Sequence, residues 1–329
     1  MAEPIDNIVF AVNKEPYCLW GHDLRKRNLQ FLGDFDVEFF EYSMERHLEA
    51  EDEQRASIAL RITLHHALET MFALVGAYVQ APLCAYAWIS KYSNADLRNF
   101  VERINREDDA IYCMVNMDSV SWEAIAKAVF ACYLPDTPKQ AQTIQMFSTQ
   151  WRRLATILLA EGERDQYNAL KHGLRVQKGG FGIAYGLEPS PGVPAPPESM
   201  RSLGSSDFGM SFHKVRAVAD GGITKENRSV CCEQHSHNWS VEQTILLIQM
   251  VSMSISNLVS SLKVLNGAEA STCKFVRPEN NDGFDQAWAH GVGLTHASFN
   301  FVVDESNTRP VSKDQLIEYL SEATATEQT

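Results

Sequence analysis

Apolar residues recur every three or four positions through much of the first half of the chain. The clearest stretch covers residues 55–79, and side chains at that spacing share one face of a helix, which folding must bury. The pattern predicts a long helix with one buried stripe, ended by Ala81 and Pro82. The stripe consists of Leu60, Leu64, Leu68, Met71, Phe72, Val75 and Val79.

Polar residues at the ends of other apolar stretches predict where further helices begin and stop. Ser93, Thr137 and Ser240 each precede such a stretch, and their hydroxyls suit a helix N-cap. Gly173 and Gly267 follow two of the stretches, where glycine favours a left-handed stop. The helices predicted in this way begin after Ser93 and cover residues 122–132, 137–158, 163–173 and 240–265.

Segments rich in β-forming residues lie between and after these helices. The run from Pro189 to Pro197 is rich in proline, which predicts an extended, solvated loop. A short helix at 312–320 and a polar tail from Ala323 are expected at the end of the chain. The predicted strands cover residues 7–12, 181–185, 208–219 and 297–303.

Together these elements predict a mainly α-helical protein. The helices begin near Asp36, and residues 36–178 are expected to form a bundle that residues 240–265 complete, because the latter helix is apolar around most of its circumference. Residues 179–239 then form a small strand-and-proline excursion. Residues 266–329 form a short α+β C-terminal segment with a disordered tail.

Charge and cysteine usage narrow the class of protein. The net charge of -13 disfavours a protein that coats nucleic acid or an anionic membrane with its whole surface. The seven cysteines are odd in number and scattered, and the first residues lack the pattern of a secretory signal, so we expect a cytoplasmic protein. Residues 244–262 carry no charge over the length of a membrane span, but their glutamine, asparagine and five serines argue against insertion.

The first candidate site is the helix end at residues 167–175. Asn168 and His172 stand one helical turn apart, and Lys171 and Arg175 flank them. Residues 151–178 hold six lysines or arginines against three acids. This local basic patch predicts binding of a phosphate or an RNA backbone. The alternative is structural, because cations are favoured in the last turn of any helix and the two polar side chains can satisfy backbone groups.

The helical region, with its Tyr-Asn-x-x-Lys-His-Gly-x-Arg helix end, resembles HEPN-type helical bundles, many of which belong to prokaryotic toxin and defence systems. The resemblance covers roughly residues 50–180 and extends to 240–265. It implies an RNA-directed role, and in members that cleave RNA an Arg and a His separated by four to six residues. Arg164 and His172 have seven residues between them and depart from that pattern.

Two other pairs fit that spacing. These are Arg61 with His66 and Arg228 with His235, about as many as a random arrangement of the arginines and histidines would give. If the protein cleaves RNA, the resemblance implies a metal-independent reaction with a His as base and an Arg stabilising the transition state. His172, or the pair of Arg61 and His66, would fill these roles.

The second candidate is the row of Arg61, His65 and Glu69 on the long helix, with His66 adjacent. These residues stand at i, i+4 and i+8 and border the apolar stripe. Glu69 can orient His65 as a base or share a metal with it. The alternative is an ordinary network of side chains along a helix.

The third candidate is a metal site around Cys231, Cys232, His235 and His237. A His-x-His pair on an extended segment aims both rings to one side, and Cys232 and His235 have a familiar ligand spacing. Adjacent cysteines point apart, so we expect no metal ion or other cofactor. Only the fold could complete a site, with His213, Cys273, His290 or His296.

Two hypotheses of function follow. In the first, a cytoplasmic HEPN-like bundle binds RNA or acts on it, using catalytic candidates from the two helical sites and Lys171 and Arg175 for phosphate. In the second, the protein is a non-enzymatic scaffold that homo-oligomerises and contacts partners through its proline-rich excursion. A metal-dependent enzyme is a third class. The catalytic candidates are Arg61, His65, His66, Glu69, Asn168 and His172.

Overall fold

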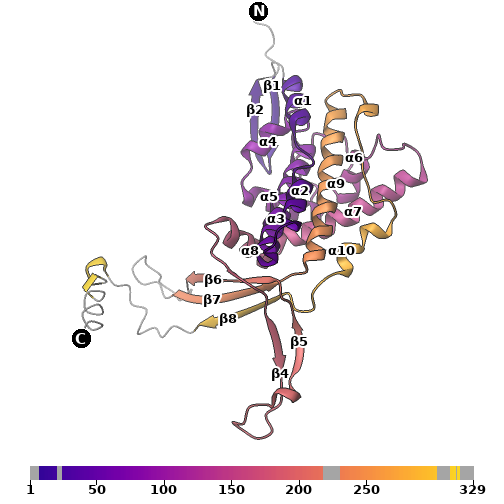
Figure 1. Ribbon diagram of the computed structural model, residues 1–329. Helices are drawn as coiled ribbons and strands as arrows, with labels where there is room; N and C mark the ends of the chain where they lie inside the picture. The colour runs from indigo at the N-terminus through magenta and orange to yellow at the C-terminus, as the bar shows by residue number, and fades with distance from the viewer. Residues whose placement is uncertain (1–6, 21–23, 218–229, 302–311, 316, 319–329) are drawn as a thin grey trace, which may run out of the picture.

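The computed structural model describes residues 7–20, 24–217, 230–301, 312–315 and 317–318. Its described part is mainly helical, as predicted (Figure 1). The helices are α1 (Leu24–Asp34), α2 (Phe39–Leu48), α3 (Glu53–Gln80), α4 (Ala85–Lys91), α5 (Asn94–Asn105), α6 (Trp122–Val129), α7 (Pro138–Leu159), α8 (Glu161–Lys171), α9 (Val241–Leu265) and α10 (Gln286–Ala289). The strands are β1 (Asn7–Val12), β2 (Glu15–Trp20), β3 (Gln177–Lys178), β4 (Gly182–Tyr185), β5 (Arg201–Ser205), β6 (Gly209–Ala217), β7 (Val230–Asn238) and β8 (His296–Phe301).

Helix α3 is the centre of the bundle and packs along α9. The stripe predicted on α3 is buried throughout, and α2, α4, α5, α7 and α8 also contact this helix. Both α3 and α9 are long and apolar enough to cross a membrane by composition, but 67% and 72% of their apolar windows are buried inside the protein. Burial of this extent is typical of the central helices of a helical bundle. Apolar residues of α3 and α9 thus belong to one buried core, to which residues such as Leu32 and Phe284 outside the ranges 36–178 and 240–265 also contribute.

Several helix ends follow the predicted chemistry. Ser93, Thr137 and Ser240 each accept a hydrogen bond from a backbone N–H of the first turn. Gly173 and Gly267 adopt φ values of +94° and +98°, the left-handed conformation expected after a helix. The local sequence therefore fixes where α5, α7, α8 and α9 begin or end.

The N-terminal region departs from the prediction. Helix α1 begins well before Asp36, and β2 pairs with the predicted β1 in an antiparallel hairpin. Asn28 holds α1 in place by donating to Pro82 O and accepting from the N–H of Ala85. Helix α1 has only a narrow apolar face, so its position depends on such tertiary contacts, which periodicity does not reveal.

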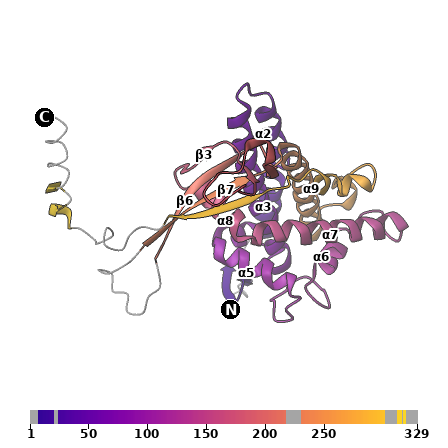
Figure 2. The same cartoon turned by 90° about the horizontal axis from the view of Figure 1, so that it is seen from below.

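A four-stranded antiparallel sheet, in the order β3-β6-β7-β8, lies against α3 and α8 (Figure 2). The sheet joins the central excursion to the C-terminal segment, because β8 pairs with β7. The predicted strands at 208–219 and 297–303 correspond to β6 and β8, and their last residues lie outside the described part. A second apolar cluster fills the space between sheet and helices, and it contains Ala169, Leu170, Met210, Phe212 and Trp239.

Strands β4 and β5 form a separate hairpin that extends away from the helices in Figure 1. The proline-rich run connects these strands as a largely irregular loop, as predicted. Residues 313–315 and 317–318 are helical, in agreement with the helix expected there. Residue 316, residues 319–320 and the tail from Ala323 lie outside the described residues.

Candidate functional site

Helices α3 and α8 are joined by a ladder of polar side chains. Arg61 donates from Nη2 to both carboxylate oxygens of Glu163, at 2.6 and 2.7 Å, and from Nε to Gln166 Oε1 at 2.8 Å. One turn further along α3, His65 Nε2 lies 2.8 Å from the same oxygen. We call the set of six residues the α3–α8 ladder. It consists of Arg61, His65, Glu69, Glu163, Gln166 and Tyr167.

The ladder fixes the tautomer of His65. The Nε–H of Arg61 can only donate, so the Gln166 atom that it contacts must be the amide oxygen. His65 Nε2 contacts this oxygen and therefore carries the proton. Within the described residues, both polar contacts of the ring involve Nε2. Nδ1 thus keeps its lone pair and is the ring nitrogen left for a ligand.

The electrostatics keep His65 neutral near pH 7. Burial and then the charge of Arg61 lower the pKa of His65 from 6.5 to about 4, although Glu163 and Gln166 act in the opposite direction. Burial acts to raise the pKa of Glu163, but the charge of Arg61, with the charges of His65 and His237 once these rings are protonated, outweighs burial and lowers the pKa. At neutral pH the ladder therefore holds a carboxylate, a guanidinium and a neutral imidazole.

Tyr167 forms the other end of the ladder. Its ring stacks on His65 with centroids 5.1 Å apart, and its hydroxyl donates to Glu69 Oε2 at 3.0 Å. The ammonium of Lys171 lies 4.7 Å from the Tyr167 ring centroid. With its amide oxygen turned toward Lys171, Asn94 links Glu69 at 2.6 Å and Lys171 at 2.7 Å.

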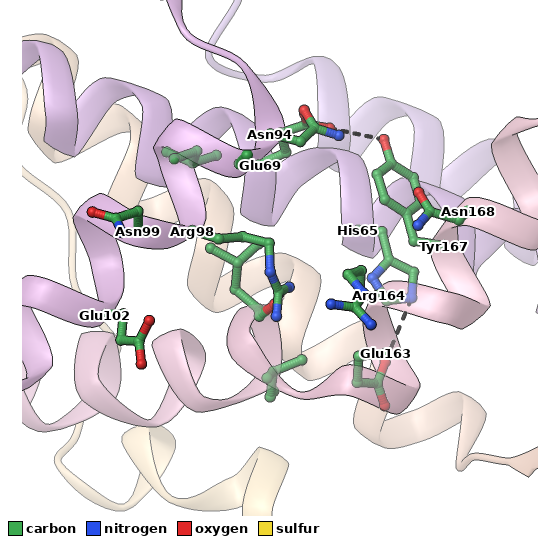
Figure 3. A pocket seen from close by; sticks show the side chains of 14 residues that line it. His65, Glu69, Asn94, Arg98, Asn99, Glu102, Glu163, Arg164, Tyr167 and Asn168 are labelled. Carbon is green, nitrogen blue, oxygen red and sulfur yellow. Dashed lines mark hydrogen bonds and ion pairs between the residues drawn. The ribbon is translucent and has the colours of Figure 1, made fainter. Parts of the chain in front are cut away.

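This ladder forms one wall of a cleft of about 420 Å³ between α3, α5, α7 and α8. Figure 3 shows His65, Glu163, Tyr167 and Asn168 on one side and residues of α5 on the other. The opposite wall carries Arg98, whose guanidinium donates to the carbonyls of Leu158 and Leu159 at the end of α7. The polar lining residues are His65, Glu69, Asn94, Arg98, Asn99, Glu102, Glu163, Arg164, Tyr167 and Asn168.

The structure brings some of the sequence candidates together and separates others. His65, Glu69 and Asn168 line the cleft, and Arg61 is buried behind it in the ladder. His66 lies elsewhere, against the Phe40 ring at 5.3 Å. His172 is the exposed C-cap residue of α8 and does not line the cleft.

The basic patch predicted at residues 151–178 is largely paired with acids. The flanking carboxylates reduce its net attraction for a polyanion, although exposed pairs of this kind are weak and an anion can compete for them. Lys171 contacts Asn94 and the Tyr167 ring, both of which line the cleft, and Arg175 is exposed. The pairs are Arg152–Glu107, Arg153–Asp285, Arg164–Glu161, Arg164–Asp165 and Lys178–Asp52.

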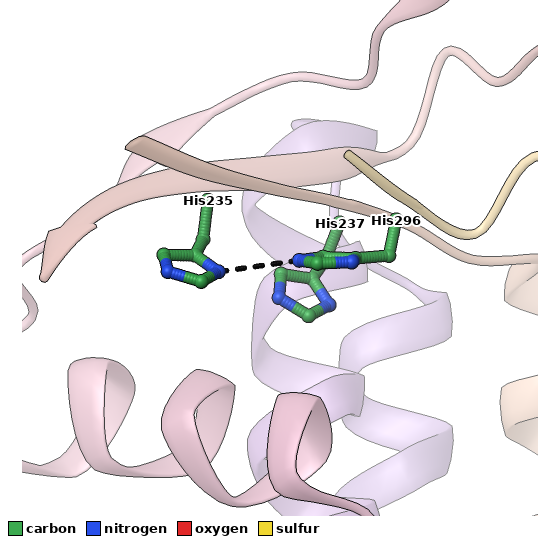
Figure 4. Close-up of side chains that lie close together, drawn as sticks. All are labelled: His235, His237 and His296. Atoms are coloured by element: carbon green, nitrogen blue, oxygen red, sulfur yellow. Dashed lines mark hydrogen bonds between the residues drawn. The ribbon is translucent and has the colours of Figure 1, made fainter. Parts of the chain in front are cut away.

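The metal-ligand candidates on β7 lie on opposite faces of the sheet. Cys232 and His235 are three residues apart in β7, so they project to opposite faces of the sheet. His235 and His237 share the face toward α8, where His296 of β8 joins them (Figure 4). Arg228 and the side chain of Cys231 lie outside the described residues. Of the four residues that the fold could have added to His235 and His237, His296 is the one that the structure brings to them.

Sequence reasoning did not find Glu163, Gln166 and Tyr167. One signal was available, because Ala169 and Leu170 mark the buried side of α8 and Gln166 stands four residues before Leu170. On a helix with 100° per residue, His172 projects roughly 160° away from Leu170. The apolar positions thus place His172 on the side of α8 that faces away from α3.

Comparisons of the chain with protein-family models, with curated proteins and with solved structures found no match.

Proposed function

We propose that this protein binds single-stranded RNA in the cleft between α3, α5, α7 and α8 and cleaves it with His65 as the base. The resemblance of residues 50–180 to HEPN-type bundles supports RNA as the ligand. The observation that carries the proposal is the state of His65, a neutral imidazole whose proton is held on Nε2 by Gln166. Its Nδ1 is thereby a fixed acceptor at the wall of a cleft.

In the proposed reaction, His65 Nδ1 accepts the proton of a ribose 2′-OH. The 2′ oxygen then bonds to the adjacent phosphorus and the bond from phosphorus to the 5′ oxygen breaks. Water supplies the proton to that leaving oxygen, and the hydroxide so formed takes the proton back from His65. Arg164, which lines the cleft and is partly exposed, stabilises the charge on the phosphoryl oxygens. The products are a 2′,3′-cyclic phosphate and a 5′-hydroxyl.

The size and charge of the cleft limit how much RNA it can hold. Its volume lies in the lower part of the range of roughly 300–1,000 Å³ for ligand sites. Glu69, Glu102 and Glu163 lie in the lining together with Arg98 and Arg164, so a long run of phosphates is repelled. We therefore expect contact with one or two nucleotides, through Arg164 and Lys171.

The direct test uses the full chain, a short single-stranded RNA and the matching DNA strand, in buffer with a chelator. We expect cleavage of RNA alone, with cyclic phosphate ends. His65→Gln should slow the reaction at least about 100-fold, in line with loss of a general base. His66→Gln, a change at the adjacent histidine outside the cleft, is the matched control and should leave the rate unchanged, as should His172→Gln.

The salt dependence of RNA binding tests the number of phosphate contacts. Two contacts predict a slope of about -1.4 in a plot of log affinity against log salt, since each single-strand contact contributes about -0.7. No binding by the unaltered protein, or a loss of cleavage in His172→Gln instead of His65→Gln, contradicts the proposal. If the unaltered protein binds RNA but does not cleave it, only the catalytic role of His65 is refuted, and the RNA-binding part of the proposal stands.

The second candidate function, a non-catalytic protein that homo-oligomerises, is supported by the hairpin of β4 and β5. Its apolar side chains face solvent, with Leu187, Leu203 and Tyr185 exposed by 86%, 57% and 49%. A two-stranded hairpin is at best marginally stable alone in water, so a partner would stabilise this one. Light scattering during gel filtration should then show a dimer for the unaltered chain and a monomer for Leu187→Ser combined with Leu203→Ser.

A further inference from the structure

The sheet places three histidines together on the face that packs against the helices. In the β6–β7–β8 register, His237 pairs with His296, and His235 stands two residues before His237 on the same face. One ring nitrogen from each histidine lies within 4.8 Å of the other two. We call His235, His237 and His296 the histidine trio. His237 and His296 are 59 positions apart in the sequence, and the pairing of β7 with β8 brings them together.

The hydrogen bonds of His235 show which of its ring nitrogens can bind a metal ion. His235 Nε2 lies 3.0 Å from a carboxylate oxygen of Glu233, which can only accept, so this nitrogen carries the proton. Nδ1 of His235 therefore accepts a hydrogen bond from His296 Nε2, 3.2 Å away. A metal ion between the two nitrogens would replace this hydrogen bond once the His296 proton has moved to its Nδ1. Two imidazole nitrogens on one tetrahedral Zn²⁺, each at about 2.0–2.1 Å, stand roughly 3.3 Å apart.

A buried nitrogen of His237 without a hydrogen-bond partner is a second observation that points to a ligand at the trio. The side chain of His237 is buried, with 5% of the residue exposed, and its Nε2 has no hydrogen-bond partner among the described residues. Buried polar atoms are almost always paired, so this nitrogen calls for a ligand. We propose that the histidine trio binds one divalent transition-metal ion of the zinc class through three imidazole nitrogens.

The surroundings match those of an imidazole metal site. Glu233 accepts from the far nitrogen of His235, and a carboxylate in this position orients a histidine ligand and increases its basicity. Imidazole donors suit zinc, copper, iron and nickel, and not magnesium or calcium, which prefer oxygen. The Phe212 ring stacks on both His235 and His237, with centroids 5.5 and 5.6 Å away, and the charges of Glu163 and Arg61 also act on His237.

Three protein ligands leave one tetrahedral position for water or an exchangeable anion. This is the arrangement of a zinc ion that acts on a ligand, whereas structural zinc sites use four protein ligands. The exposed His296 forms the solvent side of the trio, so small molecules can reach the ion. The structure thus assigns to this face an open metal centre, separate from the RNA cleft proposed above.

The experiment measures metal binding by the full chain without RNA. Protein stripped with chelator is titrated with Zn²⁺ in a calorimeter and with Co²⁺ in a visible spectrophotometer. We expect one ion per chain and the visible bands of tetrahedral Co²⁺ with nitrogen ligands. His296→Ala, a change at an exposed position that the fold tolerates, should weaken binding at least about 100-fold, and Glu233→Gln about 10-fold.

His213→Ala is the matched control, because His213 lies on β6 at an exposed position and does not belong to the trio. It should leave the affinity and the Co²⁺ spectrum unchanged. A sulfur-to-cobalt charge-transfer band would assign the ion to cysteines and overturn the proposal. So would an unaltered chain that binds less than one ion, or a His296→Ala protein that binds as tightly as the unaltered one.

Discussion

Replacing Arg61 by Met tests whether the α3–α8 ladder holds the site together. The side chains of Arg61 and Glu163 are 8% and 25% exposed, and the change removes both bonds between them as well as the bond to Gln166. Breaking a buried ion pair by removing one partner costs about 3–5 kcal/mol. Because water reaches part of Glu163, we expect Arg61→Met to lower the free energy of unfolding by about 2–4 kcal/mol.

Urea unfolding at pH 7, followed by circular dichroism, measures this loss. Arg106→Met is the matched control, since Arg106 pairs with Glu102 on α5 but the two side chains are 73% and 47% exposed. Its loss should stay below about 0.5 kcal/mol. Glu163→Gln and the double variant complete a cycle, in which the double variant should cost at least about 1 kcal/mol less than the sum. A loss below about 1 kcal/mol for Arg61→Met, or additivity within about 0.5 kcal/mol, refutes the reasoning.

Two further predictions concern pH and packing. The pKa of His65 is about 4 in the folded protein and 6.5 for an ordinary histidine of the unfolded chain. The unfolded chain therefore binds more protons between these values, and stability falls as pH drops from 6.5 to 4. His65→Gln should remove up to about 3 kcal/mol of that fall in urea unfolding across this range. In Gly76→Ala, the new Cβ would lie 2.3 Å from two ring carbons of the buried Trp88, and thermal unfolding should show a loss of about 1–3 kcal/mol. Gly33→Ala, where a Cβ meets nothing within 4 Å, should instead gain up to about 1 kcal/mol from helix propensity, and equal effects of the two changes contradict this account of packing.

The sequence predicts the bundle well because its helices carry local signals. The stripe on α3 and the caps at Ser93, Thr137 and Ser240 each depend on residues a few positions apart. Helix α1 and strand β2 lack such signals. Asn28 secures α1 through residues 54 and 57 positions away, and no pattern within α1 encodes that contact.

The candidate site divides in the same way. The row of Arg61, His65 and Glu69 is visible in the sequence because a single helix aligns it. Its partners on α8 depend on how α3 and α8 meet, as His65 and Gln166 do across 101 positions of the chain. The trio needs β8 beside β7, a pairing of distant strands that β-propensity does not specify.

Glu163 lies between the cleft and the histidine trio. It binds Arg61 in the ladder, and its charge also acts on His237. The neighbouring Gly162 lets the two approach, since a Cβ there would lie 3.1 Å from His237 Cε1. A divalent ion in the trio would raise the electrostatic potential at the cleft, so it should tighten binding of an anionic strand, by about 5-fold or more if the coupling reaches the usual range. By reciprocity, RNA must then increase the affinity for Zn²⁺ by the same factor. Titrations of each ligand in the presence and in the absence of the other measure the two factors. Unequal factors would show that the two ligands are not at equilibrium, and factors of one would show that the two sites are not coupled.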